Sequence, residues 1–457
     1  MGTIDTDALR SAIRGGVITP DDPGYDEARR VFNAMIDRRP AVIVRSLDTQ
    51  DVATAVTHAA RAGAAIAVRG GGHSVPGFGT ADDAVVIDLS GMRAVDVDPE
   101  NRTARAQGGA TWGIFNDATH AHGLATTGGV VSTTGVGGLT LGGGIGYLAR
   151  KAGLSLDNLI EAEVVIADGS IVRASEREHD DLFWAIRGGG GNFGVVTEFV
   201  FGLHPVSDVY GGPMFFELDA AGDVLRFYRD FIRDAPEELG GFPAFQIAPP
   251  LPFIPEDRHG DTFLAFIACW AGPIDEGENV LKPLHDVAPV VAEHVGPIPY
   301  PALNAAFDAL YPAGELRHYW KTRFTKDLPD EAIDVHVAHG SRVPNLQSTV
   351  HFYPINGACH RVAPDATAFS YRDATFATVI AGMWPDAADD DDRIAWVRRY
   401  FDATAPYAEA GGYVNFMSDD DQGQIRPSYR DNYDRLVEIK RSYDPENLFR
   451  VNQNIAP

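Results

Sequence analysis

Residues 64–74 read AAIAVRGGGHS, a short apolar run that ends in three glycines, a histidine and a serine. An earlier apolar run, AVIVR (41–45), has the same strand character. Between the two runs, four apolar residues recur at the spacing of one helix face: Val52, Ala55, Val56 and Ala59. Asp48 suits the start of such a helix and Gly63 its end. We therefore predict a β-α-β unit that ends in a glycine loop and a histidine.

Three glycine-rich stretches stand out: RGGGHS (69–74), GVGGLTLGGGIG (135–146) and GGGGNFG (188–194). Glycine runs let successive backbone N–H groups converge on one ligand, as phosphate oxygens require. The first run ends in a histidine instead of opening a helix, so it does not fit the dinucleotide fingerprint of Rossmann domains. The pattern predicts a diphosphate cofactor that is bound by glycine loops of a fold other than the Rossmann fold.

The order of predicted strands and helices divides the chain. Up to His204-Pro205, short strands alternate with helices, and VVIADGSIV (164–172) is predicted to be a hairpin with Asp168-Gly169 as its turn. Aromatic-rich strands and longer helices follow, typical of an α+β domain with an antiparallel sheet. Near the C-terminus we predict a short strand at YVNFM (413–417). The predicted parts are residues 1–205, residues 206–410, and a segment 411–457 that returns to the first part.

The composition excludes several classes of partner. The chain has 38 Lys and Arg against 64 Asp and Glu, and its net charge of −26 repels nucleic acid and anionic lipid. MGTIDTDALR (1–10) shows no signal segment, and no apolar run approaches the ~20 residues of a membrane span. Cys269 and Cys359 lack metal-ligand spacing, and the histidines form no metal-binding pattern. We expect a soluble cytoplasmic protein that binds small molecules and no metal; the sequence predicts no oligomeric state.

Both ends of the chain resemble one family of flavoenzymes. The segments that carry the resemblance are RGGGHS (69–74), TTGVGGLTLGGGIGYLARKAGLSLDNL (133–159), GGGGNFGVVTEF (188–199) and YDPENLFRVNQNI (443–455). They resemble the vanillyl-alcohol-oxidase superfamily, which has a PCMH-type FAD-binding domain, and within it the branch like berberine bridge enzyme. The resemblance implies a two-domain α+β fold. Residues 1–205 with 411–457 would bind FAD, and residues 206–410 would form a substrate domain, an antiparallel sheet covered by helices.

The resemblance also implies a covalent cofactor. In this family the histidine of the RGGGH stretch is bonded to the 8α-methyl carbon of the flavin, and His73 stands at that position. Many relatives add a cysteine tether within a Gly-Val-Cys-Pro-Thr segment, where this chain reads GVVST (129–133). Val131 occupies the cysteine position, so we expect FAD to be attached through His73 alone.

The residues expected to contact FAD come from the glycine-rich stretches and the C-terminal segment. They are Arg69, Gly70, Gly71, Gly72, His73, Ser74, Thr134, Gly135, Gly137, Gly138, Gly142, Gly143, Gly144, Ile145, Gly146, Val196, Asn415, Asn452 and Asn454. The central region is the part that resembles the family least, and it contributes none of them.

Three side chains are candidates for the chemistry. Relatives carry a Tyr-x-Asn-Tyr segment near the reacting centre, and YVNF (413–416) matches it with Phe in the last place. Tyr413 is therefore the candidate base or orienting hydroxyl, with a buried aromatic role as the alternative. Lys321 is a candidate for assistance through its charge, with an ordinary solvated lysine as the alternative. Thr134 stands where relatives gate O2, and its small size predicts an open gate.

Other family features bear on the pocket. The Glu or Gln of plant relatives falls near Ile380, so this chain lacks that group. Four aromatic residues of the central region are candidates for the pocket wall, with a role in the core as the alternative: Trp320, Phe352, Tyr353 and Trp384.

These inferences favour an FAD-linked oxidase. It would take hydride from an alcohol, hemiacetal or related C–H donor to flavin N5 and be reoxidised by O2, giving H2O2. A dehydrogenase with another acceptor and an amine-oxidising enzyme are the alternatives. A catalytically inactive flavin-binding protein is a third possibility of a different class, which substrate-dependent bleaching of the flavin would exclude. The sequence does not name the substrate.

Overall fold

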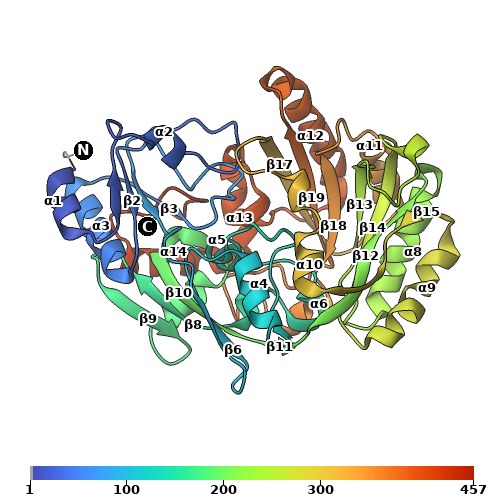
Figure 1. Cartoon of the computed structure of the whole chain (residues 1–457), viewed down its shortest axis with the longest axis horizontal. Coiled ribbons are helices and arrows are strands. Elements are labelled where there is room, and N and C mark those ends of the chain that lie inside the picture. Colours follow the sequence, from blue (N-terminus) through green and yellow to red (C-terminus); the bar gives the residue numbers. More distant parts are fainter. Residues whose placement is uncertain (1–3) are drawn as a thin grey trace.

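The computed structural model describes residues 4–457, so residues 1–3 of the first predicted domain lie outside the described residues. Two lobes lie side by side, and both ends of the chain belong to the same lobe (Figure 1). Each lobe combines helices with β-sheet, and the sheet of the second lobe is antiparallel throughout. The predicted α+β fold with two lobes is confirmed.

The first lobe contains the predicted β-α-β unit. The Asp48 side chain accepts a hydrogen bond from the Asp51 N–H at the start of α3, and Gly63 ends that helix with φ of 62°. Strand β4 lies between β2 and β3 and is parallel to both. The elements are α1 (Thr6–Ala12), β1 (Gly16–Ile18), α2 (Tyr25–Ala28), β2 (Val42–Arg45), α3 (Thr49–Ala62), β3 (Ile66–Arg69) and β4 (Val85–Asp88). The glycine loop therefore begins where β3 ends.

A five-stranded antiparallel sheet completes this lobe, in the order β5-β6-β10-β8-β9. The predicted hairpin is present, but its turn was predicted one residue too short. Ile166 N–H donates to the Ser170 carbonyl and Gly169 N–H donates to the Ile166 carbonyl, so this pair closes a loop of three residues, 167–169. The loop ends in Gly169, a left-handed glycine with φ of 85°. The strands are β5 (Val95–Asp98), β6 (Thr103–Gln107), β8 (Leu159–Val165), β9 (Ile171–Ser175) and β10 (Val195–Gly202).

Short helices surround the glycine-rich stretches of the first lobe. Their buried apolar residues form one core with the five-stranded sheet, in which Trp112 and Phe199 are fully buried. The elements are α4 (Trp112–His120), β7 (Leu124–Ala125), α5 (Val136–Gly142), α6 (Ala149–Ala152), α7 (Asp180–Ile186) and β11 (His204–Pro205). Helix α5 places the second glycine-rich stretch beside the first.

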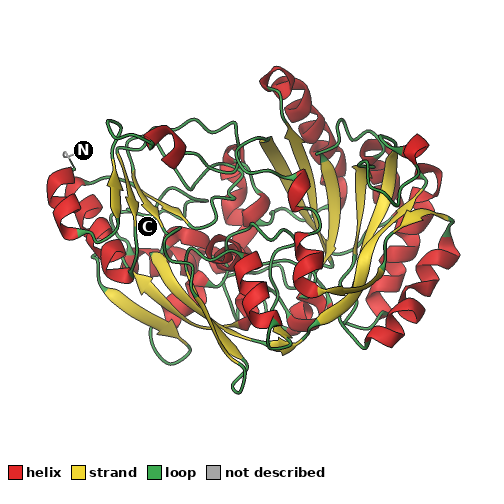
Figure 2. Ribbon diagram, viewed as in Figure 1, coloured by secondary structure: helices red, strands yellow, loops and turns green. Residues whose placement is uncertain are grey.

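The second lobe is one large sheet; four of its helices pack on one face, and the fifth, α10, packs on the face toward the first lobe (Figure 2). Its strand order is β15-β12-β14-β13-β18-β19-β17, with β16 paired to β12. The strands are β12 (Asp208–Phe216), β13 (Phe242–Ile247), β14 (Thr262–Trp270), β15 (Val290–Glu293), β16 (Gly296–Pro299), β17 (Arg317–Thr325), β18 (Thr349–Pro354) and β19 (Phe376–Trp384). The helices are α8 (Ala221–Asp234), α9 (Gly277–Val287), α10 (Tyr300–Ala305), α11 (Asp330–Gly340) and α12 (Asp390–Thr404).

The C-terminal segment is hydrogen-bonded to the first lobe at Asn192. Lys440 Nζ donates to the Asn192 carbonyl at 2.7 Å, and Ile455 N–H donates to Asn192 Oδ1 at 2.9 Å. The predicted strand at 413–417 is wrong: this stretch forms a 3₁₀ turn over Val414–Phe416, between α12 and the helices α13 (Ile425–Tyr429) and α14 (Tyr433–Tyr443). We propose to keep the domain limits 1–205, 206–410 and 411–457, because β11 ends at residue 205 and the second sheet begins at 208.

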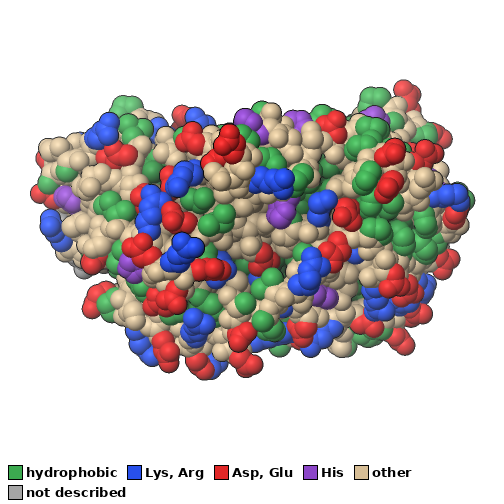
Figure 3. Space-filling view, turned by 90° about the horizontal axis from the view of Figure 1, so that it is seen from below, with side chains coloured by type: hydrophobic (Ala, Val, Ile, Leu, Met, Phe, Trp, Pro, Cys, Tyr) green, Lys and Arg blue, Asp and Glu red, His purple; other side chains and the backbone are tan. Residues whose placement is uncertain are grey.

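The surface agrees with the acidic composition. On the face in Figure 3, acidic side chains are spread over both lobes among the arginines and lysines, with no single basic patch. Among residues 4–457, no helix is long and apolar enough to span a bilayer.

Candidate active site

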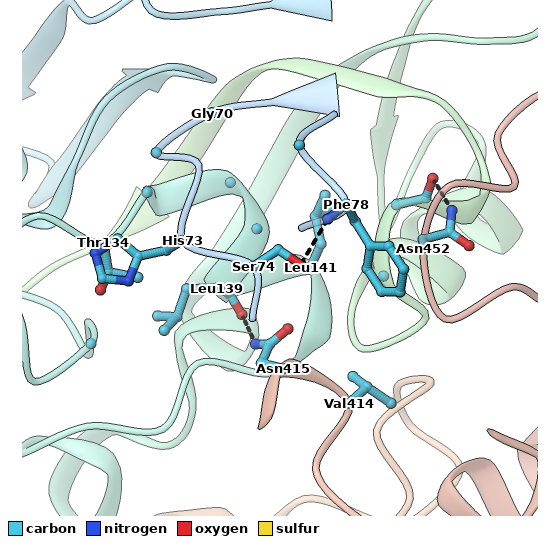
Figure 4. A pocket seen from close by; sticks show the side chains of 18 of the residues that line it. Gly70, His73, Ser74, Phe78, Thr134, Leu139, Leu141, Val414, Asn415 and Asn452 are labelled. Atoms are coloured by element: carbon cyan, nitrogen blue, oxygen red, sulfur yellow. Dashed lines mark hydrogen bonds between the residues drawn. The ribbon is translucent and has the colours of Figure 1, made fainter. Parts of the chain in front are cut away.

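A cavity of about 310 Å³ lies where the two lobes and the C-terminal segment meet. Glycine loops of the first lobe form one wall, and strands β18 and β19 of the second lobe form another. The turn that carries Asn415 and the tail that carries Asn452 close it (Figure 4). The Asn415 amide donates to the Leu139 carbonyl at 2.9 Å, and the Asn452 amide donates to the Gly191 carbonyl at 3.1 Å. The C-terminal segment is thereby tied to two of the glycine-rich stretches.

The first two glycine loops touch through their backbones. A Cβ on Gly71 would lie 2.7 Å from Gly135 Cα, and a Cβ on Gly135 would lie 2.5 Å from Gly71 N. Real side chains do not approach this closely, so both positions require glycine. Gly135 is the N-cap of α5, and Gly137 and Gly138 in the first turn of the helix also line the cavity. Backbone N–H groups at a helix start suit the oxygens of a diphosphate.

His73 stands at the cavity wall with one ring nitrogen engaged. Its Nε2 lies 2.8 Å from Thr133 Oγ1, and its ring stacks on Phe32 with centroids 3.8 Å apart. Burial lowers the pKa of His73 to about 4, so the imidazole is neutral near pH 7. A ring whose Nε2–H donates to Thr133 leaves the Nδ1 lone pair as a nucleophile.

Arg69 does not face the cavity, contrary to its predicted cofactor contact. Its guanidinium is buried, donating to Asp88 at 2.8 Å and to the Ala28 carbonyl at 2.6 Å. Burial alone would raise the pKa of Asp88, but Arg69 and the bonds from Ser90 hold this pKa below its ordinary value. Arg69 therefore anchors the start of the glycine loop from behind.

The structure brings most predicted cofactor residues to one cavity. Those that line it are Gly70, Gly71, Gly72, His73, Ser74, Thr134, Gly135, Gly137, Gly138, Ile145, Val196, Asn415 and Asn452. Those that do not are Arg69, Gly142, Gly143, Gly144, Gly146 and Asn454. The later glycines of the second stretch have a packing role: a Cβ on Gly143 would lie 2.7 Å from the Tyr413 ring, and one on Gly144 would lie 2.9 Å from Ser155 N.

Tyr413 lies behind the second glycine stretch and not in the cavity wall. Its hydroxyl accepts hydrogen bonds from Gly144 N–H at 2.7 Å and Asn415 Nδ2 at 2.9 Å, and the side chain is buried. Burial raises the pKa of Tyr413 above its ordinary value although these bonds lower it. Phe416, at the last place of the YVNF segment, does line the cavity and has no hydroxyl. The geometry of Tyr413 fits the alternative, a buried aromatic with a bonded hydroxyl.

Lys321 is also absent from the cavity wall. It lies on β17, where the adjacent Trp320 lines the cavity, and alternation along the strand turns Lys321 to the other face. Its ammonium donates to Asp420 at 2.7 Å and also bonds Asp421. Burial lowers the pKa of Lys321, but these two carboxylates raise it above the ordinary value. Lys321 is a buried ion-pair partner and not the solvated lysine of the alternative prediction.

Strands β18 and β19 of the second lobe contribute cavity residues of which the sequence singled out only Tyr353. Strand β18 presents Thr349, His351 and Tyr353, and β19 presents Val379, Ala381 and Met383. Of the four aromatic candidates, Trp320 and Tyr353 line the cavity, whereas Phe352 and Trp384 pack under the helices. Alternation of side chains along two antiparallel strands is the sequence signal that could have distinguished the residues facing the cavity from those facing the helices. It could be used only once the strands were known to cover the cavity.

The chemistry of the lining fits FAD. A diphosphate can be met by the glycine N–H groups, and the long apolar walls suit a flat ring system. Three buried polar atoms at the cavity have no partner among the described residues: Tyr429 Oη, Trp320 Nε1 and Asn452 Oδ1. Such orphaned groups are expected where a polar ligand supplies their hydrogen bonds. Over residues 4–457, no cluster of His, Cys, Asp and Glu has the form of a metal site.

Comparisons with known proteins agree with this fit. The family model for the FAD binding domain matches residues 40–175, and the model described as berberine and berberine like matches residues 412–456. The FAD-linked oxidoreductase YgaK of Bacillus subtilis (strain 168) is 31% identical over 98% of both chains. The structure of 6-hydroxy-D-nicotine oxidase from Arthrobacter nicotinovorans aligns with TM-score 0.86 and 27% identity, covering 97% of this chain and 98% of that one.

A further solved structure is informative about the cofactor. Glucooligosaccharide oxidase from Acremonium strictum aligns over 100% of both chains with TM-score 0.86 and 25% identity, and it carries a 6-S-cysteinyl, 8α-N1-histidyl FAD. The molecule described here has the features of an FAD-linked oxidoreductase. The chain belongs to the berberine bridge enzyme-like family of these oxidoreductases, within the superfamily with a PCMH-type FAD-binding fold.

Proposed function

We propose that the protein is an oxidase that carries FAD covalently on His73. The observation that carries the proposal is the position of this imidazole: neutral, at the wall of the cavity, and held through Nε2 by Thr133 so that Nδ1 is left to form the bond. Relatives named as oxidases, and the histidyl FAD of glucooligosaccharide oxidase, support it.

Attachment through one residue follows from the cysteine positions. Val131 lines the cavity at the place of the second tether. Cys269 and Cys359 are both buried elsewhere, and burial raises the pKa of each thiol to about 12, so neither supplies a thiolate at neutral pH. The proposed cofactor is therefore an FAD with a single covalent bond.

When bound, FAD supplies a hydride acceptor at N5 of its ring system. The glycine loops around Gly71 and Gly135 would hold the diphosphate, and Asn415 and Asn452 present amides to the same cavity. Thr134 also faces the cavity, and no hydrogen bond within the described chain engages its hydroxyl. Its small side chain is the basis for proposing O2 as the electron acceptor, with H2O2 as the product.

The lining also limits the donor. None of the Asp, Glu, Lys or Arg side chains of residues 4–457 lines the cavity, and its lining includes Tyr311, Trp320, Met383 and Phe416. Burying a charge in such surroundings without a partner is costly, so an uncharged donor is favoured over an ammonium ion. We propose an alcohol or hemiacetal with an apolar, flat body.

The test is a donor screen with two readouts. Anaerobic bleaching of the yellow flavin by a member of a panel of aromatic and alicyclic alcohols, and H2O2 release once air is admitted, would support the oxidase. Flavin that bleaches and then reoxidises only with a quinone-like dye would replace it by a dehydrogenase. Flavin that no alcohol, hemiacetal or amine bleaches would refute the proposal in favour of a binding protein.

A further inference from the structure

A tyrosine and a histidine on β18 form a hydrogen-bonded pair at the cavity wall. His351 and Tyr353 are two residues apart on the strand, so both side chains lie on the face that lines the cavity. The distance from His351 Nδ1 to Tyr353 Oη is 2.6 Å. The Tyr353 ring packs between Phe242, at 4.6 Å between centroids, and Phe416, at 6.0 Å. The pair is therefore fixed in an aromatic frame.

Few other groups in the described cavity wall can take a proton from a donor. Tyr413 and Lys321, the candidates from sequence, lie outside it, and position 416 carries a phenylalanine. Tyr311 and Tyr429 line the cavity, but no hydrogen bond joins either hydroxyl to a second proton acceptor among residues 4–457. Tyr353 is the lining tyrosine whose hydroxyl lies within hydrogen-bond distance of an imidazole nitrogen.

Building on the proposed oxidase, we propose that Tyr353 and His351 are the catalytic pair that takes the proton of the donor hydroxyl. The donor O–H bond breaks as its proton bonds to Tyr353 Oη, and the phenol proton passes to His351 Nδ1. With FAD bound, the flavin would accept the hydrogen and electron pair of the donor C–H bond as this bond breaks and a C=O bond forms. The proton on His351 then returns to solvent.

Burial fixes the resting protonation of the pair. Burial lowers the pKa of His351 to about 3 and raises that of Tyr353 well above its ordinary value, so the phenol is protonated and the imidazole neutral. The titratable groups that influence Tyr353 are Tyr311 and Tyr413, both uncharged near neutral pH. A free imidazolium is unfavourable in this cavity, so proton transfer is coupled to the departure of the hydride.

The test compares two tyrosines in stopped-flow reduction of the flavin by a donor that the panel identifies. Tyr353→Phe should slow reduction at least about 10²-fold, a usual acid–base contribution. Its flavin content and its affinity for a non-oxidisable ether of the donor should stay unchanged. Tyr400→Phe is the matched control, because Tyr400 is a buried tyrosine that bonds His336 Nδ1 at 2.9 Å outside the cavity. It should leave the rate unchanged.

A second variant keeps the proposal testable if Tyr353→Phe does not fold. His351→Ala should reduce slowly and regain part of its rate when imidazole is added, which a purely structural role would not produce. An unchanged rate in Tyr353→Phe, or a slow His351→Ala that imidazole does not rescue, would overturn the pair while leaving the oxidase intact. Wild-type flavin that no donor bleaches would instead refute the oxidase itself.

Discussion

A methyl group on Gly71 should separate the two glycine loops and reduce flavin binding. In Gly71→Ala the new Cβ would lie 2.7 Å from Gly135 Cα, whereas ordinary contact begins at 3.4 Å. The obstacle is backbone, so the loops must move apart by the difference, 3.4 − 2.7 = 0.7 Å, or more. Overpacking of this kind costs about 1–3 kcal/mol, and a misplacement near 1 Å can cost about 10²-fold in rate.

The assay measures the ratio of flavin to polypeptide by absorbance and the midpoint of thermal unfolding by circular dichroism. Gly71→Ala should lower both. Gly423→Ala is the control, because Gly423 lies in an exposed turn and its Cβ would meet nothing within 4 Å. Full flavin content and an unchanged midpoint in Gly71→Ala would refute the reasoning that the loop contact positions the cofactor.

Three further predictions follow from single side chains and from the buried histidines. Thr134→Leu should slow reoxidation of the reduced enzyme by O2 at least about tenfold, or about 1.4 kcal/mol, and an unchanged rate in stopped-flow would exclude Thr134 as the gate. Tyr413→Phe removes the acceptor of the Gly144 N–H and should lower the midpoint of thermal unfolding without changing the rate of flavin reduction; reduction slowed about 10²-fold would return Tyr413 to the catalytic machinery. Burial holds the pKa of His318 and His336 at about 3, below the ordinary 6.5. Both histidines therefore bind protons on unfolding between pH 6.5 and pH 3. The free energy of unfolding should fall as pH drops below 6.5, by about 1.4 kcal/mol per pH unit for each histidine. Equal free energies of unfolding in urea at pH 6.5 and pH 4.5 would contradict this.

Local signals in the sequence were sufficient to predict much of the structure of the first lobe. Asp48 and Gly63 mark the ends of α3 because capping depends on a few neighbouring atoms, and the glycine loops follow from residue type alone. The stretch around Tyr413 was misjudged as a strand because its shape depends on bonds to Gly144 and Leu139, which are remote in sequence. Long-range partners of this kind leave no local pattern.

The residues of the candidate site also divide into those that a local motif predicts and those that depend on partners remote in sequence. His73 and the glycines of the first loop line the cavity, and the sequence pointed to them because they lie in one contiguous motif. Arg69 was misplaced because the motif does not reveal that Asp88, on a neighbouring strand, turns the guanidinium away from the cavity. The sequence did not reveal His351 and Tyr353 as a pair, because their place at the cavity depends on which face of β18 covers it.

The most direct test of the central claim is peptide mapping of the acid-denatured wild-type protein by mass spectrometry. We predict one flavin per chain, found on the peptide that contains His73 and on neither cysteine peptide, and lost in His73→Ala. Flavin that separates completely from the polypeptide on acid precipitation, or that maps to another residue, would contradict the account.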